Sequence, residues 1–278
     1  MRDTSLPARW QQVSLCCASW QTAEAMAITR LAPLMATAED ARLTACWWFT
    51  RKGPCWRLRI LPTAGHDEEA AAFISDLAGR VTREQAAERC PQGIYEPEIH
   101  AFGGDAAMDI AHRLFHADSR TILAHLARDG PGHRRELGLI LAALLLRAAG
   151  QDWYEQGDIW RRVTAHRRAP TAQDPPPGDA VQTLITANPA AVAPLRSLPE
   201  WPAAFEQAGS ELAGLARDGH LTRGLRAVLA HHVLFAWNRL GLPAADQHHL
   251  AVAAGNVVFG DAPVTSPPVP ATPTTAEA

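Results

Sequence analysis

The sequence from residue 95 to residue 105 reads YEPEIHAFGGD, and a long helical pattern follows it. Pro97 lacks a backbone N–H and disfavours the helical region at Glu96, so the run is predicted to begin extended. Gly103-Gly104 permits a turn at positive φ, after which Asp105 is a suitable N-cap. Such an arrangement can hold polar loop side chains against a rigid helix, as active sites often do. The alternative is a strand–turn–helix joint that carries no chemistry.

The helix predicted after this turn spans residues 105–128. Its apolar residues recur at three- and four-residue spacing, which indicates one buried face; they are Met108, Ala111, Phe115, Ile122 and Leu126. The remaining pattern divides the chain into two halves. Strands are predicted at 10–17, 42–50 and 55–61, with helices at 22–34 (ending near Pro33) and 66–81. Beyond residue 128, helices are predicted at 134–149, 151–166, 201–217, 221–240 and 244–257, with a long loop over 169–179.

These elements predict an α+β fold. A helix-backed, mostly antiparallel sheet spans about residues 8–100, and a mainly helical half spans about residues 104–257. We interpret residues 1–260 as a single domain and the Pro/Thr-rich residues 261–278 as a disordered tail.

Composition sets further bounds on the class of protein. The chain has 278 residues, 20% charged residues and a formal net charge of −3, which does not suggest nonspecific nucleic-acid binding. It contains no apolar run of 18 residues and no apolar signal-peptide core at the N-terminus. Five cysteines, an odd number, argue against a disulfide framework. We therefore predict a reduced, cytoplasmic protein.

Three blocks of the sequence, in this order, resemble the C-terminal domain of lantibiotic dehydratases, which also occurs as a stand-alone thiopeptide-type bacteriocin biosynthesis protein. The blocks run from Trp47 to Arg59, from Tyr95 to Ser119 ("YEPE…FGG…AM.IAH.LFHADS") and from His232 to Gly241. The resemblance covers roughly residues 10–257. It implies an enzyme that modifies a ribosomally made precursor peptide in lanthipeptide or thiopeptide antibiotic biosynthesis.

Arg57 and Arg59 are two residues apart on a predicted strand, so both project from one face. Two guanidinium groups this close repel each other unless an anion or buried acids lie opposite, and guanidinium groups bind carboxylates in a bidentate manner. The alternative is a solvated or salt-bridged sheet face. The resemblance implies that the first arginine of such a strand helps to bind a glutamyl group, which makes both residues candidates for substrate binding.

Glu98 and His100 lie just before the Gly-Gly turn, where side chains can point into a cleft. An imidazole can act as a general acid or base near neutral pH, so His100 is a candidate catalytic residue and Glu98 a candidate substrate-binding residue. The alternative for His100 is a surface histidine hydrogen-bonded to backbone. Eliminating members of the family usually have an arginine two residues before the Gly-Gly pair. This chain has Ala101 there.

The helix predicted over residues 221–240 contains most of the third block and carries adjacent histidines, His231 and His232. His232 and Arg239 are seven residues, or two turns, apart and fall on nearly one face, so we predict both as catalytic residues. Arg226, which precedes them with Arg223, is a candidate substrate-binding residue. The alternative is a core helix with a solvated polar edge. Eliminating relatives often have a histidine four residues before the asparagine of "N-R-L", where this chain has Leu234.

No motif indicates a metal or a cofactor. His112 and His116 have the spacing of a metal-binding pair, but the glutamate of an H-E-x-x-H motif is missing and Arg113 would repel a cation. Phosphate-binding glycine loops and Gly-x-Ser-x-Gly elbows are also missing. Asp118-Ser119 is interpreted as a structural pair on the helix surface. Tyr154 fits either a proton donor or a core residue.

Three functions are compatible with the resemblance. The first is a lyase that removes glutamate from glutamylated Ser or Thr of the precursor, giving dehydroalanine or dehydrobutyrine. The second is a pyridine synthase that joins two dehydroalanines by a formal aza-[4+2] cycloaddition and releases the leader peptide. The third is a non-catalytic subunit that binds the leader peptide for a dehydratase. The expected partners are the precursor peptide, as leader plus core, and a separate tRNA-dependent glutamylating enzyme, with no membrane and no direct nucleic-acid contact.

Overall fold

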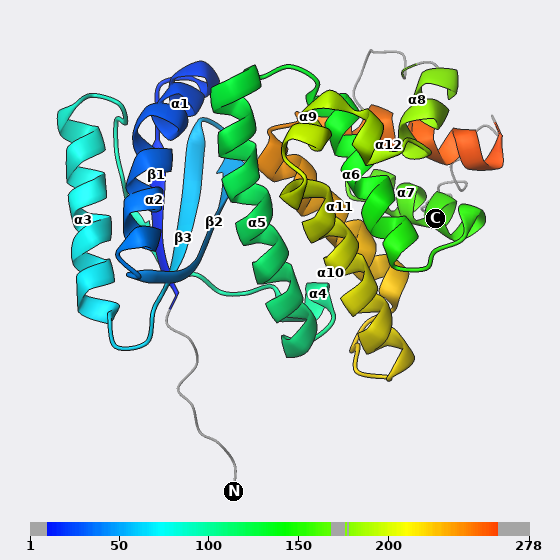
Figure 1. Cartoon of the computed structure of the whole chain (residues 1–278), viewed down its shortest axis with the longest axis horizontal. Helices are drawn as coiled ribbons and strands as arrows, with labels where there is room; N and C mark the ends of the chain where they lie inside the picture. Colours follow the sequence, from blue (N-terminus) through cyan, green and yellow to red (C-terminus); the bar gives the residue numbers. More distant parts are fainter. Residues whose placement is uncertain (1–9, 168–175, 177, 261–278) are drawn as a thin grey trace, which may run out of the picture.

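The computed structural model describes residues 10–167, 176 and 178–260. A four-stranded antiparallel sheet with helices against it forms the N-terminal half, and the remainder is mainly helical (Figure 1). The predicted α+β class is therefore confirmed. The predicted tail and residues 169–175 and 177 of the predicted loop lie outside the described residues.

The sheet has the strand order β2-β3-β1-β4. Its strands are β1 (Gln11–Cys16), β2 (Thr44–Lys52), β3 (Cys55–Pro62) and β4 (Gln92–Gly93). One face packs against helices that are close in sequence, namely α1 (Trp20–Met26), the π-helix η1 (Ala27–Leu31), α2 (Ala32–Asp40) and α3 (Asp67–Arg83). Strand β3 supplies Trp56, Leu58 and Ile60 to this core, as its alternation predicts.

The helix predicted over residues 22–34 does not end near Pro33. It continues to Asp40, because η1 forms a π-helical turn and a new α-helix begins directly after it. Pro33 is the second residue of that helix. A proline in the first helical turn needs no N–H partner, so the helix passes through it.

The prediction of a fully reduced chain is wrong for one pair of cysteines. Cys16 ends β1 and Cys55 begins β3, and the antiparallel register places the two residues opposite each other. They form a disulfide, whereas Cys17, Cys46 and Cys90 are free. The number of cysteines alone does not reveal this pairing, because it depends on a strand register between residues far apart in sequence.

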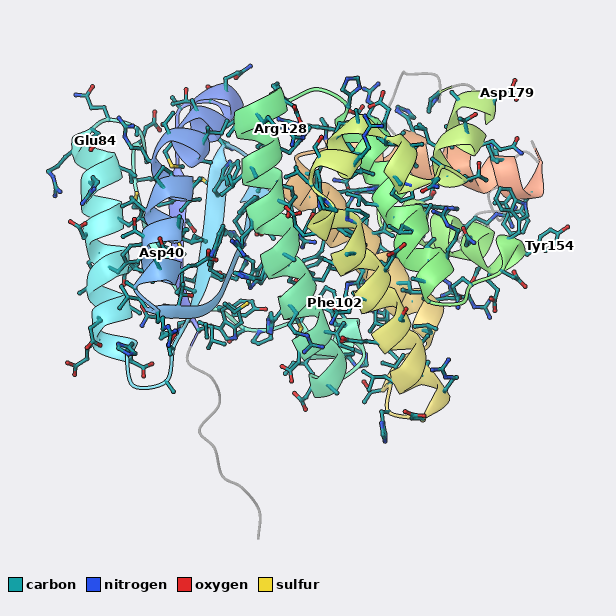
Figure 2. All side chains as sticks on the ribbon, in the orientation of Figure 1. Asp40, Glu84, Phe102, Arg128, Tyr154 and Asp179 are labelled. Carbon is teal, nitrogen blue, oxygen red and sulfur yellow. A yellow bond between two sulfur atoms is a disulfide. The ribbon has the colours of Figure 1, made fainter. Side chains whose placement is uncertain are left out.

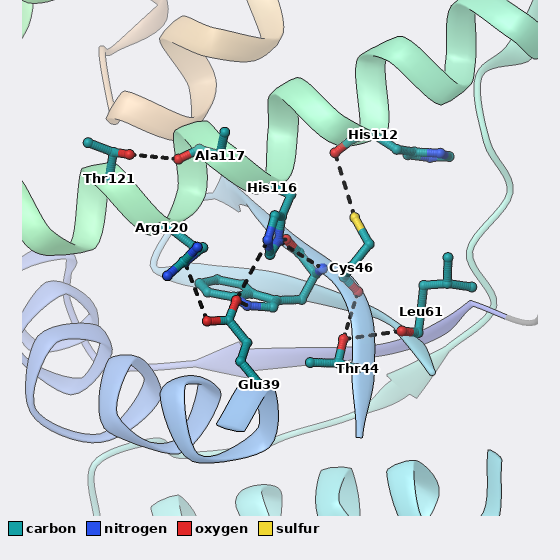
Figure 3. A network of polar contacts seen from close by, with 10 residues as sticks. Glu39, Thr44, Cys46, Leu61, His112, His116, Ala117, Arg120 and Thr121 are labelled. Carbon is teal, nitrogen blue, oxygen red and sulfur yellow. Dashed lines mark hydrogen bonds and ion pairs between the residues drawn. The ribbon is translucent and has the colours of Figure 1, made fainter. Parts of the chain in front are cut away.

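Helix α5 (Asp105–Asp129) lies along the edge of the sheet, beside β2, and between the sheet and most of the helical half (Figure 1). It satisfies backbone donors of the edge strand. The N–H of Trp47 donates to His116 Nδ1 at 3.2 Å, and the N–H of Phe49 donates to Ser119 Oγ at 3.2 Å. Glu39 joins this network through the indole of Trp47 at 2.6 Å (Figure 3). An edge strand covered in this way cannot pair with another chain.

The helical half contains α6 (Arg134–Ala148), α7 (Trp153–Ala165), α10 (Glu200–Arg217), α11 (Leu225–Leu240) and α12 (Ala244–Phe259), close to the predicted bounds. Helix α11 begins four residues later than predicted. The short helices α8 (Gly178–Ile185), η2 (Pro189–Ala191) and α9 (Ala193–Ser197) were not predicted. Within the described residues, no helix has the length and apolar character needed to cross a membrane.

The Gly-Gly turn has the predicted backbone, with φ of 94° at Gly103 and 110° at Gly104. Residues 221–224, which precede α11, hold it in place, since the N–H of Thr222 donates to the carbonyl of Gly103 at 2.9 Å. A Cβ atom at Gly103 would lie 2.9 Å from a methyl group of Val228. Two local details differ from the prediction. Gly104 rather than Asp105 is the N-cap of α5, and a short helix, α4 (Ile99–Phe102), ends the run predicted to begin extended.

Candidate functional site

The second face of the sheet carries the two predicted arginines. Cross-strand partners share a face, and the register pairs Arg57 with Ser14 and Thr50, and Arg59 with Gln12 and Trp48. This face therefore carries polar side chains around Trp48, whereas Trp56, Leu58 and Ile60 make the opposite face mainly apolar. Arg57 and Arg59 do lie side by side, as their spacing predicts.

Arg59 is held by rings and one hydroxyl. Its guanidinium carbon lies 4.1 Å from the centre of the Trp48 ring and 4.9 Å from that of Tyr95, and its Nη1 donates to Thr50 Oγ1 at 3.0 Å. Burial lowers the pKa of Arg59 to about 10, so it stays charged at neutral pH. Within the described residues no carboxylate forms an ion pair with Arg57 or Arg59. Glu98 is near enough for its charge to raise the pKa of Arg59.

A tyrosine–histidine pair adjoins Arg59 and was not predicted. The hydroxyl of Tyr95 and Nε2 of His112 are 2.8 Å apart. Burial raises the pKa of Tyr95, and burial together with Arg59 lowers the pKa of His112 to about 4, so both groups are neutral at pH 7. The signal in the sequence was that His112 falls on the apolar face of α5 with Ala111 and Phe115. His116, four residues further along α5, accepts a hydrogen bond from the backbone of β2.

A row of packed aromatic rings connects this region to α11. We call it the aromatic band, and it consists of Trp48, Phe102, Phe115 and Phe235. Ring centres are 4.7 Å apart for Trp48 and Phe115, 5.4 Å for Phe115 and Phe235, and 5.0 Å for Phe102 and Phe235. Phe102 comes from α4 and is fully buried between α5 and the helical half (Figure 2). Its ring centre lies 5.8 Å from that of His231, so the band contacts this histidine of α11.

The two residues predicted as catalytic on α11 are inside the protein. His232 has no exposed surface, and burial followed by the charges of Arg239 and His231 lowers its pKa to about 3. Arg239 is equally buried, donates to Asp118 at 2.6 Å and lies 4.3 Å from the centre of the Phe115 ring. Asp118 also accepts a hydrogen bond from the indole of Trp201 at 2.7 Å. It is therefore a buried residue that joins two helices in the core, whereas the sequence predicted it on the helix surface. We therefore leave His232 and Arg239 out of the proposed site.

The other predicted residues are exposed. Glu98 and His100 lie at the start of α4 with exposed side chains. Arg226 forms an ion pair of 3.3 Å with Asp158 of α7, which compensates its charge. Tyr154 is 66% exposed at the outer end of the helical half, away from the sheet, and does not join the site (Figure 2). Of the predicted set, Arg59 and Glu98 lie near Tyr95, and Arg57 lies next to Arg59 on the sheet face.

The chain matches the family model described as lantibiotic biosynthesis dehydratase C-term over residues 10–258. It belongs to this family. The resemblance noted in the sequence is thereby confirmed, and it extends over nearly the whole described part of the chain.

Three solved structures share the fold of this family member. The tRNA-dependent lantibiotic dehydratase MibB from Microbispora sp. 107891 has a TM-score of 0.66 at 17% identity, over 92% of this chain. The chain spans only 28% of MibB. TsrL has a TM-score of 0.58 at 14% identity, over 89% of this chain and 93% of TsrL. TbtD, a pyridine synthase from thiomuracin biosynthesis, has a TM-score of 0.57 at 14% identity, over 90% of this chain and 97% of TbtD. No curated protein sequence matches the chain.

Proposed function

We propose that the protein is a lyase that removes glutamate from glutamylated Ser or Thr side chains of a ribosomally made precursor peptide. In this reaction a base takes the α-proton of the modified residue, the Cβ–O bond breaks, and glutamate leaves as a carboxylate. The product is dehydroalanine or dehydrobutyrine. Membership of the dehydratase family supports the general role, a modification of peptides, and the site supports this particular reaction.

One observation carries the proposal: two adjacent guanidinium groups on the polar sheet face have no carboxylate paired with them within the described residues. Two unit charges about 7 Å apart repel by roughly 2 kcal/mol at an effective dielectric constant of 20. A substrate anion offsets this repulsion. Because negative charge develops on the leaving glutamate, Arg57 and Arg59 would bind the transition state more strongly than the ground state.

The neighbouring groups fit the remaining steps. The hydroxyl of Tyr95, neutral at pH 7 and oriented by His112, can donate to the carbonyl oxygen on which charge collects when the α-proton leaves. His100, exposed beside Glu98, remains the proposed base, since His232 is enclosed in the core. Glutamylation would come from a separate tRNA-dependent enzyme, and because the peptide is made on the ribosome we place the reaction in the cytoplasm.

The test is a direct mass measurement on two substrates. Purified protein is incubated with a glutamylated precursor and, separately, with a precursor that bears dehydroalanines. We expect the first peptide to lose glutamate and the second to stay unchanged. An unchanged glutamylated peptide would overturn the proposal.

A pyridine synthase is the second candidate, and one observation favours it. The two positions where eliminating relatives have an arginine and a histidine are Ala101 and the buried Leu234. A site without those two residues also suits an uncharged pair of dehydroalanines. The same experiment separates the two candidates, because a synthase would release the leader from the second peptide and leave a ring-bearing core.

A further inference from the structure

Four cationic or titratable side chains gather where the aromatic band ends. We call them the cationic cluster, and they are His166, Arg167, Arg223 and His231. His166 and Arg167 follow α7, Arg223 precedes α11, and His231 lies on it. The rings of His166 and His231 are 5.1 Å apart, and the ring of His231 also contacts Phe102. All four side chains retain some exposed surface, so a solute can reach them.

Neutral groups, not acids, hold the two arginines of the cluster. Nη1 of Arg223 donates to the carbonyl of Ala101 at 3.0 Å. Nε of Arg167 donates to Gln247 at 2.8 Å, and its Nη2 donates to Asn238 at 3.4 Å. Nδ1 of His231 is buried, and no atom of the described residues forms a hydrogen bond with it. Two guanidinium groups are therefore fixed in place next to an imidazole that still has an unused polar atom.

Within the described residues no carboxylate forms an ion pair with any member of the cluster. The acid of α7 nearest in sequence, Asp158, is already paired with Arg162 and Arg226. Glu155 on α7 caps the start of its own helix, and the charge of Glu98 before α4 raises the pKa of Arg59. Asp105 at the start of α5 forms no ion pair with any described residue. The cluster thus carries at least two positive charges that nothing in this part of the fold neutralises.

Protonation of the imidazoles reflects this imbalance. Burial, followed by the charges of His166, Arg223 and Arg167, lowers the pKa of His231 to about 4. Burial, followed by Arg167 and Arg223, also lowers the pKa of His166. A bound anion would reverse these charge effects and favour the protonated imidazole, so binding and proton uptake should be coupled.

We propose that the cationic cluster is a second anion subsite, which binds a carboxylate of the substrate at the far end of the aromatic band from Arg57 and Arg59. That an anion binds follows from the cluster itself, whereas its identification as a substrate carboxylate rests on the proposed function. The carboxylate has two possible sources, the glutamyl unit or an acidic residue of the peptide near the modified position. Guanidinium groups suit either source because their paired N–H donors match the two carboxylate oxygens.

The position of the cluster explains two departures from the family pattern. The guanidinium of Arg223 is bonded to Ala101, the residue that replaces the arginine of eliminating relatives. His231 lies three residues before Leu234, which replaces their histidine, and three residues bring side chains to neighbouring positions on a helix. Arg223 thus supplies a cation near Ala101, and His231 supplies an imidazole near Leu234.

The first experiment measures the binding of glutarate, a simple dicarboxylate, by calorimetry at pH 8 and pH 5.5. We expect tighter binding at pH 5.5 with net proton uptake, detected in two buffers of different ionisation enthalpy. Arg223→Gln should weaken binding by roughly tenfold or more, because a charge-assisted hydrogen bond is lost. His231→Gln should remove much of the pH dependence. Arg162→Gln, an ion-paired arginine of α7, is the matched control and should bind as wild type does.

A second measurement distinguishes the two sources of the carboxylate. Binding is compared for a glutamylated peptide, the same peptide without glutamate, and a peptide whose acidic residues are replaced by amides. If Arg223→Gln weakens only the glutamylated peptide, the glutamyl unit occupies the subsite. If it weakens both acid-containing peptides equally, a flanking acidic residue does.

Glutarate binding that is absent from wild type, or unchanged in folded Arg223→Gln and His231→Gln variants, overturns the subsite. Circular dichroism confirms that these variants are folded. A different observation would overturn the proposed function, namely that the peptide keeps its glutamate in the mass measurement. The binding experiment can therefore support the subsite when the mass measurement contradicts elimination, and the opposite combination is also distinguishable.

Discussion

Arg59 and Arg239 are both buried and both stacked on aromatic rings, yet their surroundings differ in one respect. Arg239 lies 4.3 Å from the centre of the Phe115 ring and is paired with Asp118 in the core. Arg59 lies 4.1 Å from the centre of the Trp48 ring, and among the described residues its side chain has only the hydroxyl of Thr50 as a hydrogen-bond partner. The charge of Arg239 is compensated inside the fold, so it serves structure. No carboxylate of the described residues is paired with Arg59, which is why we propose this guanidinium for anion binding.

The comparison predicts its largest effect at the core pair. Asp118→Asn should lower the free energy of unfolding by about 3–5 kcal/mol, because it leaves the guanidinium of Arg239 buried without a counterion. Urea denaturation at pH 7 measures this change. The matched control is Asp109→Asn on the same helix, where the side chain is exposed and the expected change is small. Equal stability of the two variants would mean that the core pair does not hold the fold.

Replacing the sheet arginine should affect the reaction instead. Arg59→Gln keeps a donor for Thr50 but removes the charge, and we expect the rate of glutamate elimination to fall about 100-fold. The free energy of unfolding should change by only about 1 kcal/mol, the size of a lost cation–π contact. Rates are followed by mass spectrometry on the glutamylated peptide. Arg30→Gln, whose arginine is paired with Glu84 on an exposed surface, is the control. Full activity in Arg59→Gln would refute the role of the arginine pair.

Acid should reveal the buried imidazoles of the core. The unfolded pKa of His232 is near 6.5 and its folded pKa is about 3, so the unfolded chain binds more protons between these values. The contribution of the neutral His232 ring to the free energy of unfolding is therefore fully present above pH 6.5. It is lost as the pH falls, by roughly 1.4 kcal/mol per pH unit. His112, with a folded pKa of about 4, adds a similar slope.

Substitution of one imidazole isolates its share of this slope. His232→Leu should flatten the dependence of unfolding free energy on pH by roughly 1.4 kcal/mol per unit between pH 6.5 and about 4. Denaturation curves at several pH values measure it, and the exposed His133→Leu is the comparison variant. Parallel curves for His232→Leu and wild type would show that this ring does not remain neutral in the fold.

Local pattern was sufficient where local sterics decide the structure. The alternation over residues 55–61 predicted which side chains of β3 face the core and that Arg57 and Arg59 share the other face. The Gly-Gly pair predicted the positive φ angles of the turn, because only glycine adopts them without strain. These features supplied the fold class and part of the candidate site.

Tertiary context decided the rest. The seven-residue spacing of His232 and Arg239 correctly places both on one helix face, but spacing does not say whether that face is turned inward. Asp118, 121 residues away along the chain, pairs with Arg239 and makes that face part of the core. The pairing of Tyr95 with His112 likewise depends on how the run before α4 crosses α5, which no local pattern encodes.

The smallest predicted effect concerns this unpredicted pair. Tyr95→Phe keeps the ring that contacts Arg59 and removes only the hydroxyl, so we expect elimination to slow by about tenfold, less than in Arg59→Gln. Stability should fall by about 1 kcal/mol, because His112 loses its partner. Tyr154→Phe is the matched control, since it removes the hydroxyl of an exposed tyrosine far from the sheet. A drop in kcat with an unchanged KM would place the hydroxyl in the transition state. An unchanged rate in Tyr95→Phe would assign the pair to packing, and Arg57 and Arg59 would then act without a neighbouring donor.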